Sequence, residues 1–594
     1  MTESTSATGP AGAGLSSTTV CVLLIAGVCL VSFFAGIGAV ALWEPDEPRF
    51  AEATRQMLLR RDVITPWFND QYRFEKPILF YWLQLPFFLV LGPTEFAARV
   101  PSALCGLLAA LAVFFITRDR SSTRAGLFAA MCLATTFRFV LYARQGLTDV
   151  PVVAAITCGI WAMSRAVLGR IPSPDLGTTS PESPISNAGR RALRTESAAG
   201  SPMAAKVAWI CAGAGILLKG PVGLLAPVIW SVWAYAAGGR GAFWRTRPVS
   251  GVVILAAIAL PWYAAMVLLH GRAFIDVALG SEVVARYLSQ DFGGPIRGPL
   301  YYWGVWIGDA MPWSLFLIPA LLWAYFRRDQ IRSGESRAMV LAAIWFVTVL
   351  LVFSGSRYKL PHYILPAYPA MAIAVGIFVN AAVEGRVPLA LWRPPSFLTG
   401  LVLAAGAVLV SLLVSRVFER QPPDAAYLVP LFLVAATVIV GVLGTSSDGR
   451  RRQASFAALV GLLAVCYGFL ATFVAPRELI RFQLAPPLAA AARRVVADSE
   501  PLAVAGGYRG QGLVFYARHT VEELPNQEAV VSFLSGPGRR HCVLPESDLE
   551  QVRDLVHRPL RVQAEARMFS VRMKRLLERE PQRAVRTMVL VTAE

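Results

Sequence analysis

The chain has 594 residues, of which 55% are hydrophobic and 16% are charged, and its formal net charge is +18. Soluble domains carry about a quarter charged residues, so this composition excludes an ordinary soluble protein and indicates an integral membrane protein. The basic residues are scattered between apolar runs, which argues against a nucleic-acid footprint and favours basic loops beside anionic lipid. The eight cysteines form no CxxC pair, so a disulfide or cysteine metal framework is not expected.

Apolar segments long enough to cross a bilayer need about 20 residues in a helix. Residues 1–18 lack the basic start of a signal peptide, so we expect a disordered cytoplasmic N-terminus followed by a retained anchor. The sequence predicts about thirteen spans. They are residues 19–42, 96–117, 125–143, 150–168, 205–218, 221–238, 249–270, 299–326, 338–354, 362–382, 397–415, 427–444 and 454–475.

Residues 78–92 form a shorter apolar run that contains Pro86. This run indicates a juxtamembrane or re-entrant helix rather than a span. It belongs to the long loop 43–95, which also contains the amphipathic stretch AEATRQMLL. We therefore expect amphipathic helices at this membrane face.

The distribution of Lys and Arg predicts the orientation. Alternate loops are basic and poor in acids, which places them in the cytoplasm together with a flexible Pro-, Ser- and Gly-rich linker at 171–202. The loops 43–95, 271–298 and 354–361 then lie outside, with the tail after Pro476. The spans and their loops, residues 19–476, are expected to form one transmembrane domain.

The tail, residues 477–594, is expected to be a small α/β domain. PLAVAGGYRGQGLVFYARHTVEEL predicts a strand, a glycine turn and then a helix or strand. HCVLPESDLEQVRDLV predicts a strand followed by a helix capped near Ser547, and RTMVLVTA predicts a closing strand. GGYRGQG lacks the spacing of a nucleotide-binding loop and is expected to be a turn.

Ionisable residues gather in the predicted outer loops and at the outer ends of spans. Such residues cost free energy when they lose water, so they indicate a functional site. Acids together with several cations suit an anionic, phosphate-bearing ligand, in which a carboxylate orients or deprotonates an acceptor. The candidates are Asp46, Glu47, Arg49, Glu75, Lys76, Asp149, Lys219, Arg286, Lys359, His362 and Tyr363.

Each candidate also has a structural interpretation. A lone Lys219 or Arg286 at a helix end more often reaches to lipid head groups, and Asp149 alone would serve as a helix cap. His362 in isolation is more often a packing or hydrogen-bonding residue than a metal ligand. Asp46 and Glu47 together exceed what helix capping needs.

The order of these motifs is specific. WEPDEPRFAE, FEKP, LTDVP, LLKGP and KLPHYILP follow one another between Trp43 and Pro369. In this the chain resembles the ArnT-like and protein O-mannosyltransferase-like membrane glycosyltransferases of the GT-C type, and in particular the aminoarabinose transferases of bacterial lipid A.

The resemblance implies a GT-C fold and an enzyme of the bacterial inner membrane, with its active site and C-terminal domain on the periplasmic side. Such enzymes take a sugar from a polyprenyl (undecaprenyl) phosphate carrier. They transfer it with inversion to a lipid A-like or another cell-envelope acceptor. A protein O-mannosyltransferase-like enzyme with a hydroxyl acceptor is the alternative. No cofactor is required, and the oligomeric state is left open.

The resemblance also implies roles for individual residues. Catalytic roles fall to Asp46, Glu47 and Asp149. Contacts to the donor or its carrier phosphate fall to Arg49, Glu75, Lys76, Lys219, Arg286, Lys359 and Tyr363. The candidate ligands of a divalent metal are Glu75 and His362.

Three departures from the aminoarabinose transferase pattern concern the substrate. Phe50 stands where those enzymes have Tyr, and Arg73 stands where they have Tyr before Phe-Glu-Lys. A histidine in the middle loop of some relatives has no counterpart in SEVVARY. These differences leave the sugar, the acceptor and a bound metal open.

Two other classes of protein predict features that this sequence lacks. A lipid-linked-sugar transporter predicts ionisable residues near the middle of spans and repeated halves. Here the charges lie at span ends, and the sequence has no evident internal repeat. A membrane anchor for a functional tail predicts a recognisable site within 477–594, and the tail offers none.

Overall fold

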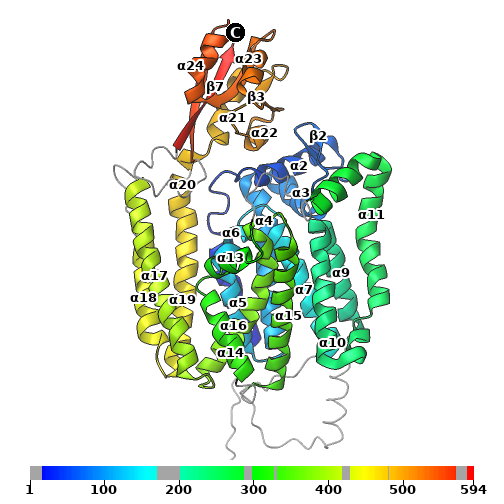
Figure 1. The fold of residues 1–594 in the computed structure, drawn as a ribbon, viewed down its shortest axis with the longest axis vertical. Helices are drawn as coiled ribbons and strands as arrows, with labels where there is room; N and C mark the ends of the chain where they lie inside the picture. Colours follow the sequence, from blue (N-terminus) through cyan, green and yellow to red (C-terminus); the bar gives the residue numbers. More distant parts are fainter. Residues whose placement is uncertain are drawn as a thin grey trace, which may run out of the picture.

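The computed structural model describes residues 16–169, 201–285, 297–326, 331–417, 428–478, 480–569 and 585–594. Within these ranges, eight helices are long and apolar enough to cross a membrane, or up to ten if each of two bent pairs is one span. Figure 1 shows a helical bundle with a small domain containing strands at one end. The predicted architecture, a polytopic helical membrane protein with a C-terminal α/β domain, is confirmed.

Every predicted span coincides with a helix or a pair of helices. In the N-terminal half these are α1 (Ser17–Cys29), α4 (Glu95–Arg118), α5 (Thr123–Ala134), α6 (Phe137–Ala143), α7 (Asp149–Leu168), α9 (Pro202–Lys219), α10 (Leu225–Arg245) and α11 (Pro248–Ile275). In the C-terminal half they are α13 (Tyr301–Asp309), α14 (Ser314–Phe326), α15 (Ser333–Gly355), α16 (Tyr368–Val383), α17 (Leu389–Val417), α18 (Leu428–Ile439) and α19 (Gly449–Phe469).

Two predicted spans are bent rather than straight. α5 and α6 meet at 69°, where the hydroxyls of Thr135 and Thr136 donate to the carbonyls of Met131 and Cys132 at 2.7 Å. Such bonds back to the preceding turn bend helices. α13 and α14 meet at 107°, where Pro312 cannot continue the helical hydrogen bonding. The first span is also shorter than predicted, since its helix ends at Phe34.

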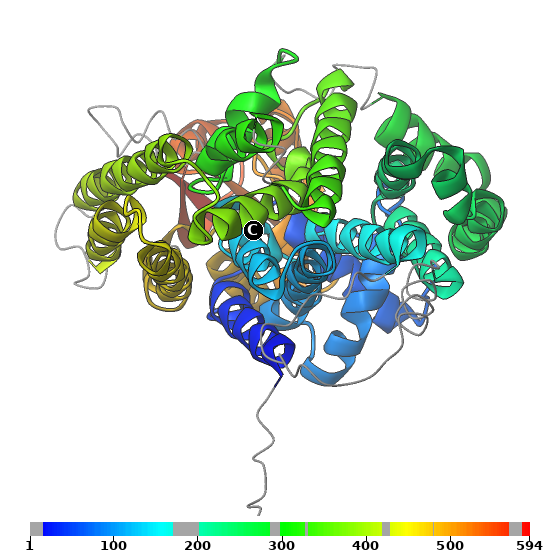
Figure 2. The same ribbon diagram turned by 90° about the horizontal axis from the view of Figure 1, so that it is seen from below.

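The centre of the bundle is α16, in which every residue from Tyr368 to Ala382 is buried. It contacts α4, α5, α14, α15 and α19. Small residues permit this close approach: a Cβ atom at Gly376 would lie 2.5 Å from the Cβ of Ala129. Seen end-on, α17 to α19 lie at one side of the bundle and α9 to α11 at the other (Figure 2).

The loop between α1 and α4 folds into two helices and a hairpin at one end of the bundle (Figure 1). They are α2 (Asp46–Arg60), the strands β1 (Trp67–Phe68) and β2 (Gln71–Tyr72), and α3 (Leu79–Leu91). α3 has 13 residues, too few to cross a bilayer. This agrees with the expected juxtamembrane helix.

The C-terminal domain contains a five-stranded sheet of order β4-β3-β5-β7-β6. The strands are β3 (Leu502–Val504), β4 (Glu522–Glu523), β5 (Arg540–Pro545), β6 (Leu560–Phe569) and β7 (Val585–Ala593). β3 pairs in parallel with β4 and β5, whereas β7 pairs antiparallel with β5 and β6. The predicted strands before and after the tail's helices are confirmed. The helix predicted to be capped near Ser547 is α24 (Glu546–Leu555), whose N-cap is Pro545.

The C-terminal domain is hydrogen-bonded to the loop that carries Asp46. The Tyr508 hydroxyl and the Gly512 N–H, at the start of α22 (Gln511–Ala517), donate to Oε1 of Glu44 at 2.9 Å and 3.0 Å. Asn69 exchanges two hydrogen bonds of 2.8 Å with the backbone of Val521. The domain therefore holds the loop from the side opposite the bundle.

Candidate active site

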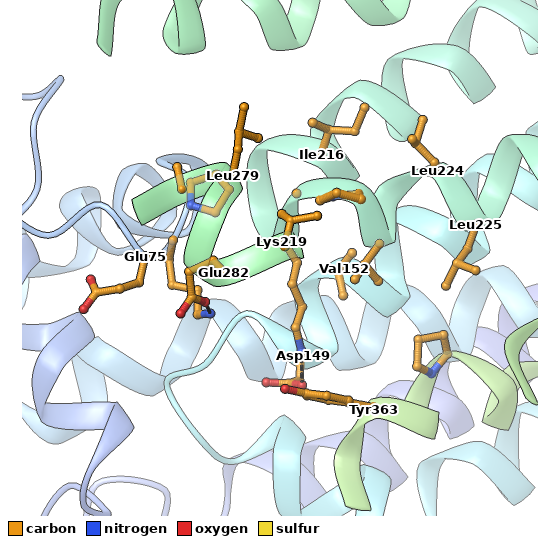
Figure 3. Close-up of a pocket in the computed structure, with 18 of the residues that line it drawn as sticks. Glu75, Asp149, Val152, Ile216, Lys219, Leu224, Leu225, Leu279, Glu282 and Tyr363 are labelled. Carbon is orange, nitrogen blue, oxygen red and sulfur yellow. Dashed lines mark hydrogen bonds and ion pairs between the residues drawn. The ribbon is translucent and has the colours of Figure 1, made fainter. Parts of the chain in front are cut away.

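A cavity of about 440 Å³ opens at the end of the bundle that carries α2 and α3. It lies between the loop 74–77, the ends of α7, α9 and α11, the π-helix η3 (Asp276–Ala285) and the 3-10 helix η5 (Pro361–Ala367). Apolar side chains such as Ile216, Leu224 and Leu225 line much of it (Figure 3). The charged or titratable side chains of its lining are Glu75, Lys76, Asp149, Lys219, Tyr263, Glu282, His362 and Tyr363.

Asp149 and Lys219 form an ion pair in this cavity. Asp149 is the first residue of α7 and Lys219 the last of α9. The Nζ of Lys219 lies 2.5 Å from Oδ1 of Asp149 (Figure 3). After Lys219 the chain turns away through Gly220 at a φ of +59°, a conformation that glycine adopts without strain. The local sequence LLKGP thus ends the helix with its ammonium group in the cavity.

Two residues of η5 complete this part of the cavity. The Nε2 of His362 lies 3.8 Å from Oδ1 of Asp149. The ring centroid of Tyr363 lies 5.6 Å from the Nζ of Lys219, a cation–π distance. Asp149, Lys219, His362 and Tyr363, all candidates from the sequence, line the same cavity in the structure.

Lys76 forms a second ion pair, with a residue that sequence reasoning missed. Its Nζ lies 2.6 Å from Oε2 of Glu282 on η3. Glu282 precedes Arg286 by four residues in SEVVAR, and an acid in a motif of phosphate-binding cations carries no signal of its own. Arg286 itself lies outside the described residues.

Glu75 faces two guanidinium groups. Its Oε1 lies 2.6 Å from Nη2 of Arg49, which lies on α2, and its Oε2 lies 3.7 Å from Nε of Arg73. Burial by itself would raise the pKa of Glu75, but the charges of Arg73 and Arg49 outweigh it and bring the pKa below its ordinary value. Glu75 is therefore a carboxylate at neutral pH.

Asp46 is the first residue of α2, and its side chain is exposed. It does not line the cavity described above, but its charge acts on Arg49 and on His362, which places it beside the cavity. An exposed carboxylate beside the cavity is accessible to a second substrate.

Glu47 occupies a different position from Asp46. Its carboxylate accepts hydrogen bonds from Nε and Nη2 of Arg99, at 2.9 Å and 2.7 Å, and from the N–H groups of Gly146 and Trp43, at 2.6 Å and 2.7 Å. Both side chains of the Glu47–Arg99 pair are 1% exposed. A carboxylate that is buried and saturated with donors does not fit the catalytic role expected for Glu47. It anchors the loop that carries Asp46.

Arg99 was not among the expected site residues, although a lone Arg in an apolar run was a signal for it. Its Nη1 also donates to the carbonyls of Ile37 and Val40, both at 2.8 Å.

Lys359 is buried too, donates to the carbonyl of Ser356 and does not line the cavity. The direct phosphate contact expected for Lys359 therefore does not fit this geometry.

Comparisons with known proteins agree with the resemblance predicted from the motifs. Residues 75–172 match the family model of dolichyl-phosphate-mannose-protein mannosyltransferases. The undecaprenyl phosphate-alpha-4-amino-4-deoxy-L-arabinose arabinosyl transferase of Photorhabdus laumondii is 26% identical over 62% of this chain and 61% of the relative. The enzyme of the same name from Pectobacterium carotovorum is 27% identical over 73% of this chain and 71% of the relative. The chain spans less than two thirds of the length of several of the curated relatives that it matches.

Solved structures show the same fold. The crystal structure of ArnT from Cupriavidus metallidurans bound to undecaprenyl phosphate matches with a TM-score of 0.70 at 20% sequence identity. The match covers 97% of this chain and 98% of that chain. The apo state of the same protein gives a TM-score of 0.68. The resemblance to ArnT-like proteins is confirmed, and the chain has the GT-C fold.

Proposed function

We propose that the chain is an integral membrane glycosyltransferase that transfers a sugar from a polyprenyl phosphate carrier to a lipid A-like or another cell-envelope acceptor. The observation that carries this proposal is the cavity itself, in which Lys76 and Lys219 stand at the end of an apolar lining. A polyprenyl phosphate is an apolar chain with an anionic head, and this cavity offers a complement to both parts.

The donor phosphate would bind Lys76 and Lys219, each of which is paired with a carboxylate in the structure. Cations at this place stabilise the charge that develops on the phosphate as it leaves. Arg286 lies beyond the described residues and is a further candidate by its sequence motif. No nucleotide is needed, because the phosphate ester already activates the sugar.

Asp46 would act on the acceptor. An acceptor oxygen attacks the anomeric carbon, the bond from that carbon to the phosphate oxygen breaks, and the configuration inverts. If the acceptor is a hydroxyl, its proton passes to Asp46. If the acceptor is a phosphate, it is already anionic and Asp46 orients it. The products are the glycosylated acceptor and the polyprenyl phosphate.

The related enzymes named undecaprenyl phosphate-alpha-4-amino-4-deoxy-L-arabinose arabinosyl transferases support an undecaprenyl phosphate donor.

The positions of the basic loops support a site on the periplasmic side of the membrane. α9 ends at the cavity with Lys219, and α10 runs back to Arg245, so the Arg-rich ends lie away from the cavity. Under the positive-inside rule those ends face the cytoplasm.

The test is transfer by the purified protein with a panel of undecaprenyl phosphate sugars and lipid A as acceptor. We expect turnover with at least one donor, and a loss of about 100-fold or more in kcat for Asp46→Asn if Asp46 is the base. Absence of turnover with every donor of the panel would contradict the proposed transfer to lipid A. Full activity of Asp46→Asn would contradict the role of Asp46 alone.

A further inference from the structure

The two residues at which the outer loop departs from the aminoarabinose transferase pattern, Phe50 and Arg73, contact each other. The guanidinium carbon of Arg73 lies 4.5 Å from the ring centroid of Phe50, a cation–π distance. Phe50 lies on α2, and Arg73 follows β2, so the pair joins the two halves of the loop. The backbone N–H of Arg73 donates to the carbonyl of Pro66 at 2.8 Å, which fixes where the side chain begins.

The Arg73 side chain is 2% exposed, and a buried guanidinium requires compensation for its charge. Its Nε and Nη1 atoms make no hydrogen bond to any residue within the described ranges. The groups around it are the Phe50 ring, the Tyr81 hydroxyl and the carboxylate of Glu75. Glu75 carries the only negative charge among these three groups, so it is the residue that compensates the charge of the Arg73 guanidinium.

The donor set around Glu75 does not fit a metal ion. Oε1 of Glu75 is hydrogen-bonded to Arg49 at 2.6 Å, whereas Oε2 accepts no hydrogen bond from any described residue and lies 3.7 Å from Nε of Arg73. The positive charges of these two guanidinium groups repel a divalent cation from either oxygen. His362 lies beside Asp149, which is already paired with Lys219. Among the residues that the structure describes, no three His, Cys, Asp or Glu side chains are grouped to hold a metal.

The nearby His270 is engaged elsewhere. Its Nε2 lies 3.0 Å from Oγ1 of Thr65, and its ring packs on Tyr72 and Phe74 at centroid distances of 4.5 Å and 5.1 Å. The sequence has no histidine between residues 271 and 296, the loop that follows it. Histidine is the commonest metal ligand in proteins, and none is placed to join Glu75.

We propose that Arg73 is a positioning residue that, together with Arg49, holds Glu75 ionised and turned from Lys76, and that this part of the site works without a divalent metal. Lys76 follows Glu75 directly in the chain but pairs with Glu282. With Glu75 held by its two guanidinium groups, Lys76 faces the cavity, where the proposed function needs a cation for the donor phosphate. The inference rests on the proposed function only in this last step.

The test follows the ionisation of Glu75 in full-length protein. Infrared difference spectra against Glu75→Gln report the carboxylate band of Glu75 as the pH is lowered. We expect Arg73→Met to raise the pH at which this band disappears by about one unit or more, the effect of losing one close opposite charge. Arg73→Lys keeps the charge and should restore most of the wild-type behaviour.

The chain offers a matched control in Arg60. Its guanidinium carbon lies 4.0 Å from the ring centroid of Trp67, and it pairs with Asp70, which repeats the arrangement of an arginine, an aromatic ring and an acid outside the cavity. Arg60→Met should leave the Glu75 band unchanged. An equal shift in Arg60→Met and Arg73→Met, or no shift in either, would overturn the positioning role of Arg73.

The metal is tested on wild-type protein, so that misfolding of a variant does not affect the result. We expect elemental analysis to find well under one equivalent of zinc or another divalent metal after purification without chelator. We also expect binding of undecaprenyl phosphate to be unchanged by EDTA. A stoichiometric metal whose removal weakens this binding contradicts the inference. Failure of the protein to bind undecaprenyl phosphate in either condition would instead contradict the proposed function.

Discussion

Glu282 holds Lys76 through an ion pair of 2.6 Å inside the cavity, so a carboxylate stands where the proposed donor phosphate would bind. The two side chains are 11% and 23% exposed, and they come from segments about 200 residues apart in the chain, on η3 and in the loop before α3. The donor must therefore compete with Glu282 for the ammonium group.

Glu282→Gln should therefore bind undecaprenyl phosphate more tightly than wild type. Removing the charge of Glu282 takes away one competitor for the Lys76 ammonium group, and we expect a Kd lower by about twofold to fivefold, since partly exposed pairs contribute up to about 1 kcal/mol. The measurement is titration of the detergent-solubilised protein with undecaprenyl phosphate. Asp276→Asn, on the same π-helix but outside the cavity lining, is the matched control. An unchanged or weaker affinity for Glu282→Gln argues against competition.

The ion pair between Asp149 and Lys219 should be more sensitive to single than to double substitution. Lys219→Met leaves the Asp149 carboxylate without its 2.5 Å partner, and Asp149→Asn leaves the ammonium group alone. Removing one partner of a fully buried pair costs about 3–5 kcal/mol, and this pair, with side chains 17% and 9% exposed, should cost less than that but more than a surface pair. We expect each single variant to lower the thermal unfolding temperature, and the double variant to be closer to wild type. Additive losses in the double variant contradict this coupling.

Asp46 and Glu47 should separate in their effects, although they are adjacent. Glu47→Gln disrupts the buried contact with Arg99, and we expect a loss of several kcal/mol in stability. Asp46→Asn alters an exposed carboxylate and should leave the unfolding temperature within a degree or two of wild type while reducing transfer. Thermal unfolding in detergent, followed by tryptophan fluorescence, distinguishes the two. Equal destabilisation by both variants would refute the separation of roles.

Gly512→Ala should loosen the C-terminal domain from the outer loop. A Cβ atom at Gly512 would overlap Oε1 of Glu44, the oxygen that receives the Tyr508 and Gly512 hydrogen bonds. We expect faster limited proteolysis between α19 and the domain, together with reduced transfer, because the contacts near Asp46 are disturbed. Gly461→Ala, at a helical glycine of α19 with open space around it, is the control. Identical proteolysis of both variants would show that the contact does not hold the domain.

The C-terminal domain should lose stability as the pH falls through the range of histidine. His541 is buried in β5, with Nε2 2.9 Å from Glu500 and Nδ1 2.9 Å from Thr592. Burial lowers the pKa of His541 below its ordinary 6.5 even though Glu500 opposes this. The unfolded chain then binds the proton more readily, so stability is present above pH 6.5 and decreases below it. Unfolding of the domain in full-length protein between pH 8 and 5 measures this, and His541→Gln should flatten the dependence.

The sequence by itself determined the spans and the motifs at their ends. Hydrophobic runs of bilayer length and the bias of Arg and Lys are local properties, so they could be read without tertiary structure. LTDVP and LLKGP also predicted that Asp149 and Lys219 stand at helix ends, and the cavity brings these ends together. The bend between α13 and α14 could not be predicted from the sequence, because the packing of neighbouring helices decides in which direction a broken helix continues.

Only the tertiary structure decided which carboxylate does what. Asp46 and Glu47 are neighbours in a motif, but successive residues of a helix point about 100° apart. One side chain is therefore exposed beside the cavity, and the other is buried against Arg99. Glu75 and Lys76 likewise take different partners, since the guanidinium groups and Glu282 approach from different elements. The roles of these carboxylates depend on partners that are far away in the sequence but close in space, and the local sequence does not specify which residues these partners are.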